Sequence, residues 1–421
     1  MEIKQEVLIT KILNFGSCNI DYVYSMEHIV RVGETLSSYK LETFPGGKGL
    51  NQSIAIARAG ATVYHAGCVG YDGAMLTDLL AESSVDISYI QTVDSKNGHA
   101  IIQVNAKGDN AIFIYPGSNA MLTEAFVDSV LENFEAGDLI LLQNEINLVD
   151  YIMEKAYCKQ MQIVFNPSPF QNEIRQLDLN KLSYMILNEV EAKELSGCES
   201  PEESLLFFRE NYPDLKVILT LGEQGCIYVD REQEVHQSAY LIHVVDSTAA
   251  GDTFTGYFVA GISCGMTVQQ SLRSASAASA LSVSRNGAAP SIPMKAEVLE
   301  ALRELKLRDA NTKQDRLRRQ IEIYIGEHIK DATLKGLAAY LKYSPVYTGA
   351  LIKQLTGDTF SNYLQNMRCK MAAKLLLESD LSIKEIIHAV GYENESFFRN
   401  RFKEKYGKNP LQFRKRKADQ T

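Results

Sequence analysis

The chain lacks the features that mark membrane, secreted and disulfide-rich proteins. No apolar run approaches the roughly 18 residues of a membrane span, and Met1 to Thr10 carries charges where a signal peptide would be apolar. The seven cysteines are odd in number and never spaced C-x-x-C, which disfavours a disulfide framework or a zinc site. We therefore predict a soluble, cytoplasmic protein without a membrane partner, in which all seven cysteines are small core residues.

Basic residues are scarce in the first three quarters of the chain and abundant in the last. Residues 1–308 hold 22 Lys and Arg against 39 Asp and Glu, whereas residues 309–421 hold 21 against 13, so the two segments carry net charges of -17 and +8. An acidic body with a basic segment is typical of an attached nucleic-acid-binding module, although an uneven solvated surface gives the same numbers. We predict two domains, 1–308 and 309–421, with a polar hinge at 304–314.

Short apolar runs alternate with helix-length segments over residues 1–300. The runs are Ile12–Phe15, Thr62–Val69, Leu139–Gln143, Ile163–Phe165, Met185–Leu187 and Val217–Leu221. Continuous apolar strands separated by helices indicate an α/β fold with a mainly parallel sheet covered on both faces. Ligands bind beyond the carboxyl ends of such strands. Polar residues and glycines do follow the runs, at Asn19, Asp21, Asn144, Glu145, Asn188, Glu191, Gly222 and Gly225.

Two separated motifs together predict phosphoryl transfer to an alcohol. Residues 249–254 read Ala-Ala-Gly-Asp-Thr-Phe, and residues 46–51 read Gly-Gly-Lys-Gly-Leu-Asn. Small residues where a helix begins leave backbone N–H groups free to bind an anion, and Asp252 beside them can take a hydroxyl proton. Each motif alone has a plainer interpretation. Gly-Gly-Lys-Gly is more often a turn and is not a P-loop, because no Ser or Thr follows Lys48, and a lone Asp252 is most simply a helix N-cap.

With Gly16–Asp21, Asn166-Pro167, Asn188–Glu191, Thr220–Gly222 and Arg285–Ser291, these motifs resemble ribokinases of the PfkB sugar-kinase family in order and spacing. The resemblance covers most of residues 11–300. It implies a three-layer α/β/α domain with a small β lid at Val23–Phe44, which in the family also forms the contact of a homodimer. It further implies that Asp252 accepts the O5 proton of D-ribose while the amides of Ala249, Ala250 and Gly251 stabilise the γ-phosphoryl of ATP.

The resemblance also assigns the remaining site residues. Sugar hydroxyls would be held by Asn19, Asp21, Gly47, Lys48, Asn51 and Glu145. The nucleotide would be lined by Asn188, Thr220, Gly222, Gly225, Gly251 and Ser276. Asn188 and Glu191 would organise Mg²⁺ through water. A K⁺ ion would be held by Asp246, Thr248, Ser282, Arg285, Gly287 and Ser291, mostly through carbonyls. The chain departs from the family at Ser276, where a His commonly meets the adenine, and at Tyr115-Pro116. A scaffold that has lost activity remains the alternative.

Beyond the hinge the pattern is helical and contains two similar units. Leu334, Leu337, Ala338 and Leu341 recur at helical spacing, and Ile383, Ile386, Ile387 and Val390 repeat that spacing 49 residues later. Each run leads through a short turn to a second helix, with Tyr347, Leu351 and Leu355 predicted inward in the first unit and Phe398, Phe402 and Tyr406 in the second. Two helices joined by a tight turn are typical of a helix-turn-helix.

The stretch from Gly391-Tyr392 to Phe413-Arg414 resembles the AraC-type DNA-binding domain, in which a long helix, here Ser361 to Leu377, joins two such units. The resemblance implies a double-stranded DNA operator as partner. The predicted contacts on the second recognition helix are Glu395, Ser396, Arg399, Asn400 and Lys403. The first recognition helix has Thr348, Gly349 and Ala350 where a basic residue is usual, so it would read DNA shape or a thymine methyl, or contribute little specificity. A helical oligomerisation module is the alternative.

Three interpretations of the fusion stay open. The chain is a working ribokinase that also regulates transcription, a regulator whose kinase fold only senses sugar, or a kinase with a vestigial appendage. The presence of Asp252 and of the magnesium pair favours the first interpretation over the second. The complete helix-turn-helix signature with its positive charge favours the first over the third.

Overall fold

The computed structural model describes residues 10–105, 110–305, 313–356, 358–379, 381–392 and 394–418. Contacts divide the chain into two compact units, Met1–Ala310 and Asn311–Thr421, here called the kinase-like unit and the helical unit. The predicted boundary between residues 308 and 309 lies outside the described residues. Each unit is described by itself.

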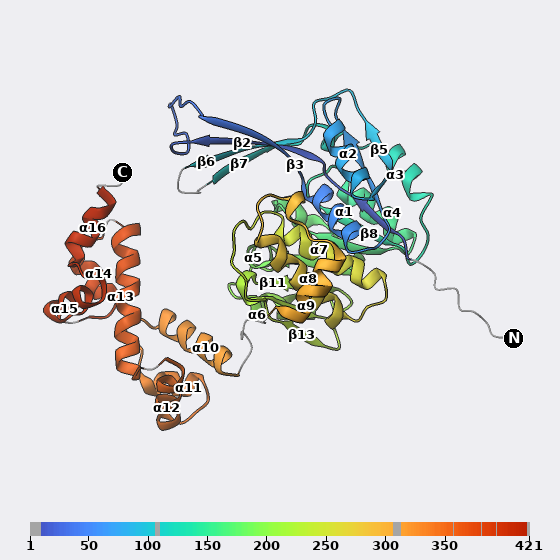
Figure 1. Cartoon of the computed structure of the whole chain (residues 1–421). Helices are drawn as coiled ribbons and strands as arrows, with labels where there is room; N and C mark the ends of the chain where they lie inside the picture. The colour runs from blue at the N-terminus through green and yellow to red at the C-terminus, as the bar shows by residue number, and fades with distance from the viewer. Residues whose placement is uncertain are drawn as a thin grey trace. The chain divides into compact units, whose positions relative to one another are not determined.

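The kinase-like unit is built on a nine-stranded sheet with the order β13-β12-β11-β10-β9-β8-β1-β4-β5 (Figure 1). The strands are β1 Ile12–Phe15, β4 Val63–Val69, β5 Asp86–Thr92, β8 Leu139–Gln143, β9 Gln162–Asn166, β10 Tyr184–Asn188, β11 Lys216–Thr220, β12 Cys226–Val229 and β13 Glu234–Gln237. All pairs are parallel except β11 with β12 and β12 with β13. The mainly parallel sheet predicted from the apolar runs is confirmed.

Helices cover both faces of this sheet, because the side chains of each strand alternate between two hydrophobic clusters. On β1, Ile12 belongs to one cluster and Leu13 to the other. The first face is covered by α1 Lys48–Arg58, α2 Ala74–Glu82, α7 Ala250–Ser263, α8 Val268–Val283 and α9 Lys295–Glu304. The second face is covered by α3 Glu124–Leu131, α4 Val149–Cys158, α5 Glu189–Ser196 and α6 Pro201–Asn211. The predicted three-layer α/β/α architecture is confirmed.

A second, smaller sheet forms the lid, with strand order β3-β2-β6-β7. Its strands are β2 Asn19–Met26, β3 Lys40–Gly46, β6 His99–Asn105 and β7 Asn110–Tyr115, and in Figure 1 they project away from the helices of the unit. The lid prediction covered only Val23–Phe44, and β6 and β7 were missed. Short 3₁₀ helices occur at Gly117–Ala120, Asn172–Gln176, Leu179–Lys181, Gly222–Gln224 and Ala289–Ser291.

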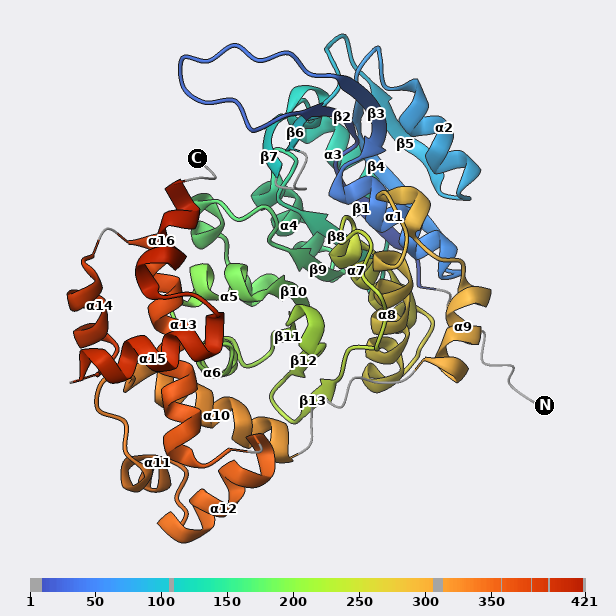
Figure 2. The same ribbon diagram turned by 60° about the vertical axis from the view of Figure 1, so that its left-hand side comes forward.

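The helical unit consists of two small cores that share one long helix, which Figure 2 shows from a second side. Its helices are α10 Lys313–Glu327, α11 Leu334–Tyr340, α12 Pro345–Thr356, α13 Phe360–Glu378, α14 Ile383–Ala389, α15 Glu395–Tyr406 and α16 Pro410–Ala418. The first core packs α10, α11 and α12 on the start of α13, and the second packs α14 and α15 on its end. The two predicted helical pairs and their connecting helix are therefore present. No helix in the described ranges is long and apolar enough to cross a membrane.

Two predictions about buried side chains were wrong. Tyr347 was expected inward but is 49% exposed, because the phase of α12 turns Thr348 and Ile352 into the core instead. The cysteines are not all core residues either. Cys158 and Cys264 are exposed and Cys198 is half-buried, since Cys158 is the last residue of α4 and Cys264 directly follows α7, where the helix ends reach the surface.

Candidate active site and nucleic-acid interface

Helix α1 begins in close contact with the end of β1, which is possible only because both segments carry glycine. A Cβ atom on Gly49 would lie 2.5 Å from the Cα of Gly16 and 2.3 Å from the backbone nitrogen of Ser17. Glu145, which follows β8, occupies the N-terminus of this helix. Its carboxylate accepts the Lys48 amide at 3.0 Å and also the Ser17 hydroxyl. The predicted sugar residues Lys48 and Glu145 are thus in contact.

Helix α7 begins without a side-chain cap, at Ala249 in the left-handed region with φ 58°. It crosses α1 closely, because a Cβ on Gly256 would lie 2.4 Å from that of Ala55. This crossing brings Asp252, which is only 7% exposed, to Asn51. Asn51 Nδ2 donates to Asp252 Oδ2 at 3.1 Å across 201 residues of sequence. The two motifs that predicted phosphoryl transfer therefore meet in space.

Two adjoining cavities open at the N-terminus of α7. One, of about 450 Å³, is lined by Lys48, Asn188, Glu191, Gly251 and Asp252 among others. The second, of about 340 Å³, is lined mainly by apolar groups. The two share Thr220, Gly222, Ser247, Ala250 and Gly251. The uncapped helix end therefore stands between a polar space beside the carboxylate and an apolar space large enough for a flat ring.

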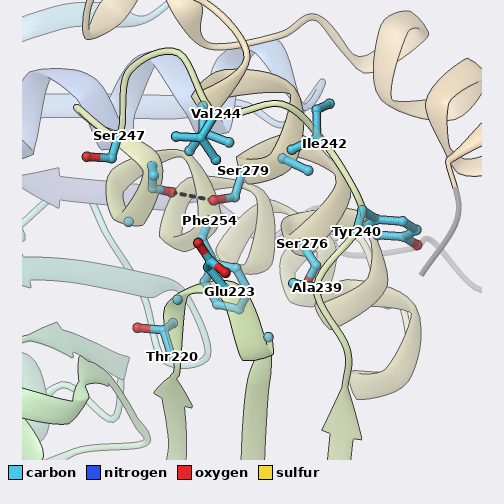
Figure 3. Close-up of a pocket in the computed structure, with 16 residues that line it drawn as sticks. Thr220, Glu223, Ala239, Tyr240, Ile242, Val244, Ser247, Phe254, Ser276 and Ser279 are labelled. Carbon is cyan, nitrogen blue, oxygen red and sulfur yellow. Dashed lines mark hydrogen bonds between the residues drawn. The ribbon is translucent and has the colours of Figure 1, made fainter. Parts of the chain in front are cut away.

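The residues that line the apolar cavity are drawn in Figure 3, where they lie between the strand that carries Thr220 and the segment 239–247. Tyr240, Ile242, Val244 and Phe254 supply apolar surface. Two of the polar side chains here are already engaged, whereas the buried Tyr240 hydroxyl has no hydrogen-bond partner among the described residues. Ser279 Oγ donates to the Ala250 carbonyl at 3.1 Å, and Thr220 Oγ1 donates to the Leu187 carbonyl at 3.3 Å. Gly222, Gly225 and Ser276, predicted nucleotide residues, line this cavity.

Carboxylates crowd around one buried lysine. Burial, reinforced by Glu145 and Asp252, raises the pKa of Asp21 to about 7. Burial likewise raises the pKa of Glu145, against the opposing effect of Lys48. For Lys48 burial by itself would lower the pKa, but Asp252, Glu145 and Glu191 outweigh it and the pKa is raised. The lysine therefore stays charged, and the site holds several hydrogen-bond acceptors suited to the hydroxyls of a polyol.

Two residues that were predicted to bind sugar differ in whether their side-chain oxygens already accept a hydrogen bond. Asn19 is buried, and its Oδ1 accepts from Asn119 Nδ2 at 2.7 Å. Asn51 is also buried, but its Oδ1 has no hydrogen-bond partner among the described residues. A buried amide oxygen without a donor is costly, so Asn51 Oδ1 is suited to receive a donor from a ligand. Gly47 precedes α1 with φ 96°, a conformation that favours glycine.

Asn188 and Glu191, predicted to organise Mg²⁺, form a reciprocal capping box at the start of α5. Asn188 Oδ1 accepts the Glu191 amide and Glu191 Oε2 accepts the Asn188 amide, both at 2.9 Å. Both residues also line the polar cavity that contains Asp252. The box uses only one of the two Glu191 carboxylate oxygens, so the pair fits a hydrated divalent cation that is reached through water.

The six predicted K⁺ residues lie on the loop before α7 and on the segment from the end of α8 to Ser291, and Asp246 joins these two segments. Its carboxylate accepts the amides of Thr248 and Gly287, each at 2.9 Å. Ser282 and Ser291 are buried and their hydroxyls bond each other at 2.8 Å. Arg285 instead forms an ion pair with Glu297 of α9. Within the described ranges no group of three or more His, Cys, Asp or Glu could hold a metal.

In the helical unit, α15 presents the predicted DNA contacts on its exposed side. Glu395, Ser396, Asn400 and Lys403 are exposed, whereas Phe398 and Phe402 on the opposite side are fully buried. Arg399 is half-buried, and its guanidinium donates twice to Glu395 Oε1, at 3.0 Å from Nε and 2.6 Å from Nη2. The arginine predicted to read a base is therefore held by an acidic neighbour one turn earlier.

The first recognition helix presents a different surface. Thr348 is fully buried and donates to the Ser344 carbonyl at 2.9 Å, so it does not belong to the exposed surface of this helix. The exposed residues of α12 include Val346, at 85%, and Tyr347, at 49%, with Ala350. This surface is mostly apolar, in contrast to that of α15.

Some polar residues next to the site were missed in the sequence. Gln52, Asn14 and Gln143 are buried near Asp252, and Gln52 donates to Asp252 directly. A signal was available, since Asn14 and Gln143 interrupt strands that are otherwise apolar. A polar side chain inside a buried parallel strand needs a partner, and therefore points to a network.

Comparison with known proteins agrees with this geometry. Residues 9–295 match the model of the pfkB family carbohydrate kinases, and residues 337–416 match that of a helix-turn-helix domain. Over 291 residues the chain is 34% identical to the ribokinase of Bacillus subtilis, covering 68% of this chain and 97% of that protein. It is 30% identical over 298 residues to the deoxyribokinase of Salmonella typhi, covering 66% and 94%. The ribokinase from Cryptococcus neoformans in complex with ADP has a TM-score of 0.63 at 33% identity, over 69% and 99% of the two chains.

A three-layer fold with an uncapped helix beside a buried aspartate, together with the family match over residues 9–295, defines the class as a carbohydrate kinase. The chain belongs to the pfkB family of carbohydrate kinases and carries an AraC-type helix-turn-helix DNA-binding domain at its C-terminal end.

Proposed function

We propose that the kinase-like unit transfers the γ-phosphoryl group of ATP to the O5 hydroxyl of D-ribose, giving D-ribose 5-phosphate. The observation that carries this proposal is the position of Asp252, fixed by Asn51 at 3.1 Å and located at the uncapped start of α7. A carboxylate in this place accepts the hydroxyl proton as the oxygen attacks phosphorus. The N–H groups of Ala249, Ala250 and Gly251 stabilise charge on the transferred group.

Cations complete the site in this proposal. Asn188 and Glu191 would hold Mg²⁺ through water, and the ion would neutralise charge on the phosphates. The loops joined by Asp246 would hold K⁺ beside the start of α7, through carbonyls. Support comes from the shared cavity of Asn188, Glu191 and Asp252, and from the Asp246 bridge between the loops.

The choice of sugar is supported by the cluster around Lys48 and by the unpartnered Asn51 Oδ1. Relatives that match the kinase-like unit are named ribokinase and deoxyribokinase, so the 2-hydroxyl is the group to test. Coupled measurement of ADP release with D-ribose, 2-deoxy-D-ribose and a set of hexoses decides this. We expect the highest kcat/KM with D-ribose. A higher kcat/KM with 2-deoxy-D-ribose would make that sugar the substrate and leave the proposed mechanism unchanged. No turnover with any sugar would leave the kinase-like unit only a sugar-sensing role.

We further propose that the helical unit binds operator DNA and regulates transcription. Support comes from the exposed polar face of α15 and from the net charge of +8 over residues 309–421. Two recognition helices would enter successive major grooves about 34 Å apart. Selection of binding sites from random duplexes with the full chain, followed by titration at several salt concentrations, tests this. Binding that is absent, or insensitive to salt, would contradict the proposal.

The two activities would be coupled through a homodimer of the lid. The outer lid strand β7 exposes Ile112, Phe113, Ile114 and Tyr115, between 44% and 56% each, which is an apolar surface suited to a second copy. If ribose shifts this dimer it shifts DNA affinity, and DNA shifts ribose affinity by the same factor, typically about 5–150-fold. Operator titrations with and without saturating ribose, in the absence of ATP, measure that factor. Superimposable isotherms would show that ribose does not control DNA binding.

A further inference from the structure

A buried glutamine contacts the carboxylate that the proposed reaction uses. Gln52 is the residue after Asn51 in α1, and its side chain is fully buried. Its Nε2 donates to Asp252 Oδ1 at 2.9 Å and to Asn166 Oδ1 at 3.2 Å. Its Oε1 accepts from Gln143 Nε2 at 2.8 Å. Both N–H groups and the carbonyl oxygen of this amide therefore form hydrogen bonds with protein groups.

The direction of this amide is fixed by its neighbours. An ionised carboxylate can only accept hydrogen bonds, so the nitrogen of Gln52 must face Asp252 and its oxygen must face Gln143. Gln143 Nε2 also donates to Asn14 Oδ1 at 2.9 Å. Asn14 Nδ2 in turn donates to the Gly49 carbonyl at 2.8 Å. Rotating any one of these buried amides would set like groups against each other, donor against donor or acceptor against acceptor, so the chain of amides holds Gln52 in one orientation.

The two oxygens of Asp252 are held by adjacent residues of α1. Gln52 binds Oδ1 and Asn51 binds Oδ2, at 2.9 and 3.1 Å. The residues differ in their other bonds. Asn51 has an unpartnered oxygen suited to a ligand, whereas Gln52 is bonded on all sides to protein. Gln52 can therefore orient the carboxylate but cannot itself contact a sugar.

We propose that Gln52 is a positioning residue for phosphoryl transfer, which fixes the rotation of the Asp252 carboxylate so that its oxygen meets the sugar hydroxyl in a constant direction. This inference rests on the proposed role of Asp252 as proton acceptor. Its physical basis is that reacting groups must be held in a near-attack geometry, and a displacement of about 1 Å can cost about 10²-fold in rate. The effect should appear in kcat, because Gln52 does not touch either substrate.

The test compares Gln52→Met with the unmodified full chain, because methionine keeps the length of glutamine and removes its donors. We expect kcat to fall about 10–100-fold, while KM for sugar and for ATP changes less than about twofold. The same substitution is then made in an Asp252→Asn background. In that background we expect kcat to fall less than about twofold further, because the carboxylate that Gln52 would position is already absent.

Ser204→Ala is the matched control. Ser204 lies in α6, is also buried and donates to the Ser200 carbonyl at 3.0 Å. It makes no described contact with Asp252 or with the chain of amides around Gln52, so we expect kcat to change less than about twofold. Circular dichroism and ATP binding establish the folded fraction of each variant. Gln52→Leu replaces Gln52→Met if the latter does not fold.

The outcomes separate the inference from the proposed function. Gln52→Met with unchanged kcat, or with the same loss in the Asp252→Asn background as in the unmodified chain, overturns the positioning role alone. A loss that appears only in KM overturns it too. If the unmodified chain phosphorylates no sugar, the proposed function and this inference fall together.

Discussion

Helix α7 of the kinase-like unit and the helices of the helical unit begin in opposite ways, although α3, α5, α6 and α8 of the kinase-like unit are capped by side chains as well. In the helical unit, side chains cap α11, α13, α14 and α15, through Thr333, Thr359, Ser382 and Asn394 respectively. Ser344 Oγ likewise accepts the Tyr347 amide at the start of α12, at 3.2 Å. In the kinase-like unit, by contrast, α7 begins at Ala249 with no side-chain cap.

The difference indicates which atoms recognise the ligand in each unit. In a capped helix, N–H groups of the first turn are already hydrogen-bonded to the capping side chain. Recognition of a ligand must therefore come from side chains further along the surface of the helix. An uncapped helix keeps those N–H groups and the positive end of its dipole for an anion. The kinase-like unit should therefore bind phosphate with main-chain groups, and the helical unit should bind DNA with side chains.

The largest expected effect comes from removing the carboxylate beside the uncapped helix. Asp252→Asn should lower kcat by about 10²–10⁴-fold, since a general base is lost. ATP affinity should change little, because the main-chain groups of α7 remain. Steady-state kinetics and calorimetric titration with ATP measure the two effects. Unmodified protein that turns over no faster than Asp252→Asn would reduce the kinase-like unit to a sensor.

The corresponding change in the helical unit is removal of the Arg399 guanidinium, which should weaken recognition of the preferred DNA site. Arg399→Ala should weaken binding to the preferred DNA site by about 1–3 kcal/mol if the guanidinium makes a bidentate contact to guanine. Competition titrations with the preferred site and a scrambled duplex distinguish the possibilities. A loss that is uniform across all sequences would make Arg399 a phosphate contact instead.

A third effect concerns the carboxylates of the sugar site. Asp21 has a pKa raised to about 7 by burial and by neighbouring carboxylates, so it gains a proton as the pH falls below 7. If sugar binds the ionised form, the dissociation constant for ribose should rise about tenfold from pH 8 to pH 6. Calorimetry without nucleotide measures it, with Asp21→Asn as the variant expected to lose this dependence. A flat profile in the unmodified protein would exclude Asp21 from sugar binding.

The smallest expected effect concerns the ion pair between Glu395 and Arg399 in α15. Glu395 holds the guanidinium of Arg399 one turn away. Glu395→Gln should lower discrimination between preferred and scrambled DNA by about twofold, the scale of an exposed i,i+4 ion pair. Affinity for scrambled DNA should rise slightly, because a negative charge facing phosphates is removed. Glu327→Gln, an exposed acid in α10, is the matched control. Equal changes in both variants would mean that only net charge matters.

The buried strands of the kinase-like unit could be predicted from sequence because parallel strands covered on both faces are continuous apolar runs. Ile12–Phe15 and Leu139–Gln143 were predicted with the bounds that β1 and β8 have. The lid strands β6 and β7 were missed because they are only partly buried or exposed, so the apolar run at 111–115 in β7 does not belong to the buried parallel sheet. The pairing of β6 with β2 also joins segments far apart in the chain.

The site could be predicted only in part, for two physical reasons. The orientation of Gln52 depends on Gln143 and Asn166, which lie 91 and 114 residues away, so no local pattern reveals it. In α12, the direction of Tyr347 depends on a phase difference of one residue, which turns a side chain by about 100°. Apolar spacing fitted Tyr347, and the structure places Thr348 in the core instead.

The close crossing of α1 and α7 at Gly256 also has a consequence for how the protein folds. Asp252 receives its hydrogen bonds from Asn51 and Gln52, 201 and 200 residues earlier in the chain. Closing so long a loop is entropically costly and is completed late in folding. During synthesis, α1 must therefore wait until α7 has emerged before the Asp252 carboxylate has its partners. The helical unit, built from neighbouring helices, is free of that delay, so DNA binding should be acquired on refolding sooner than catalysis.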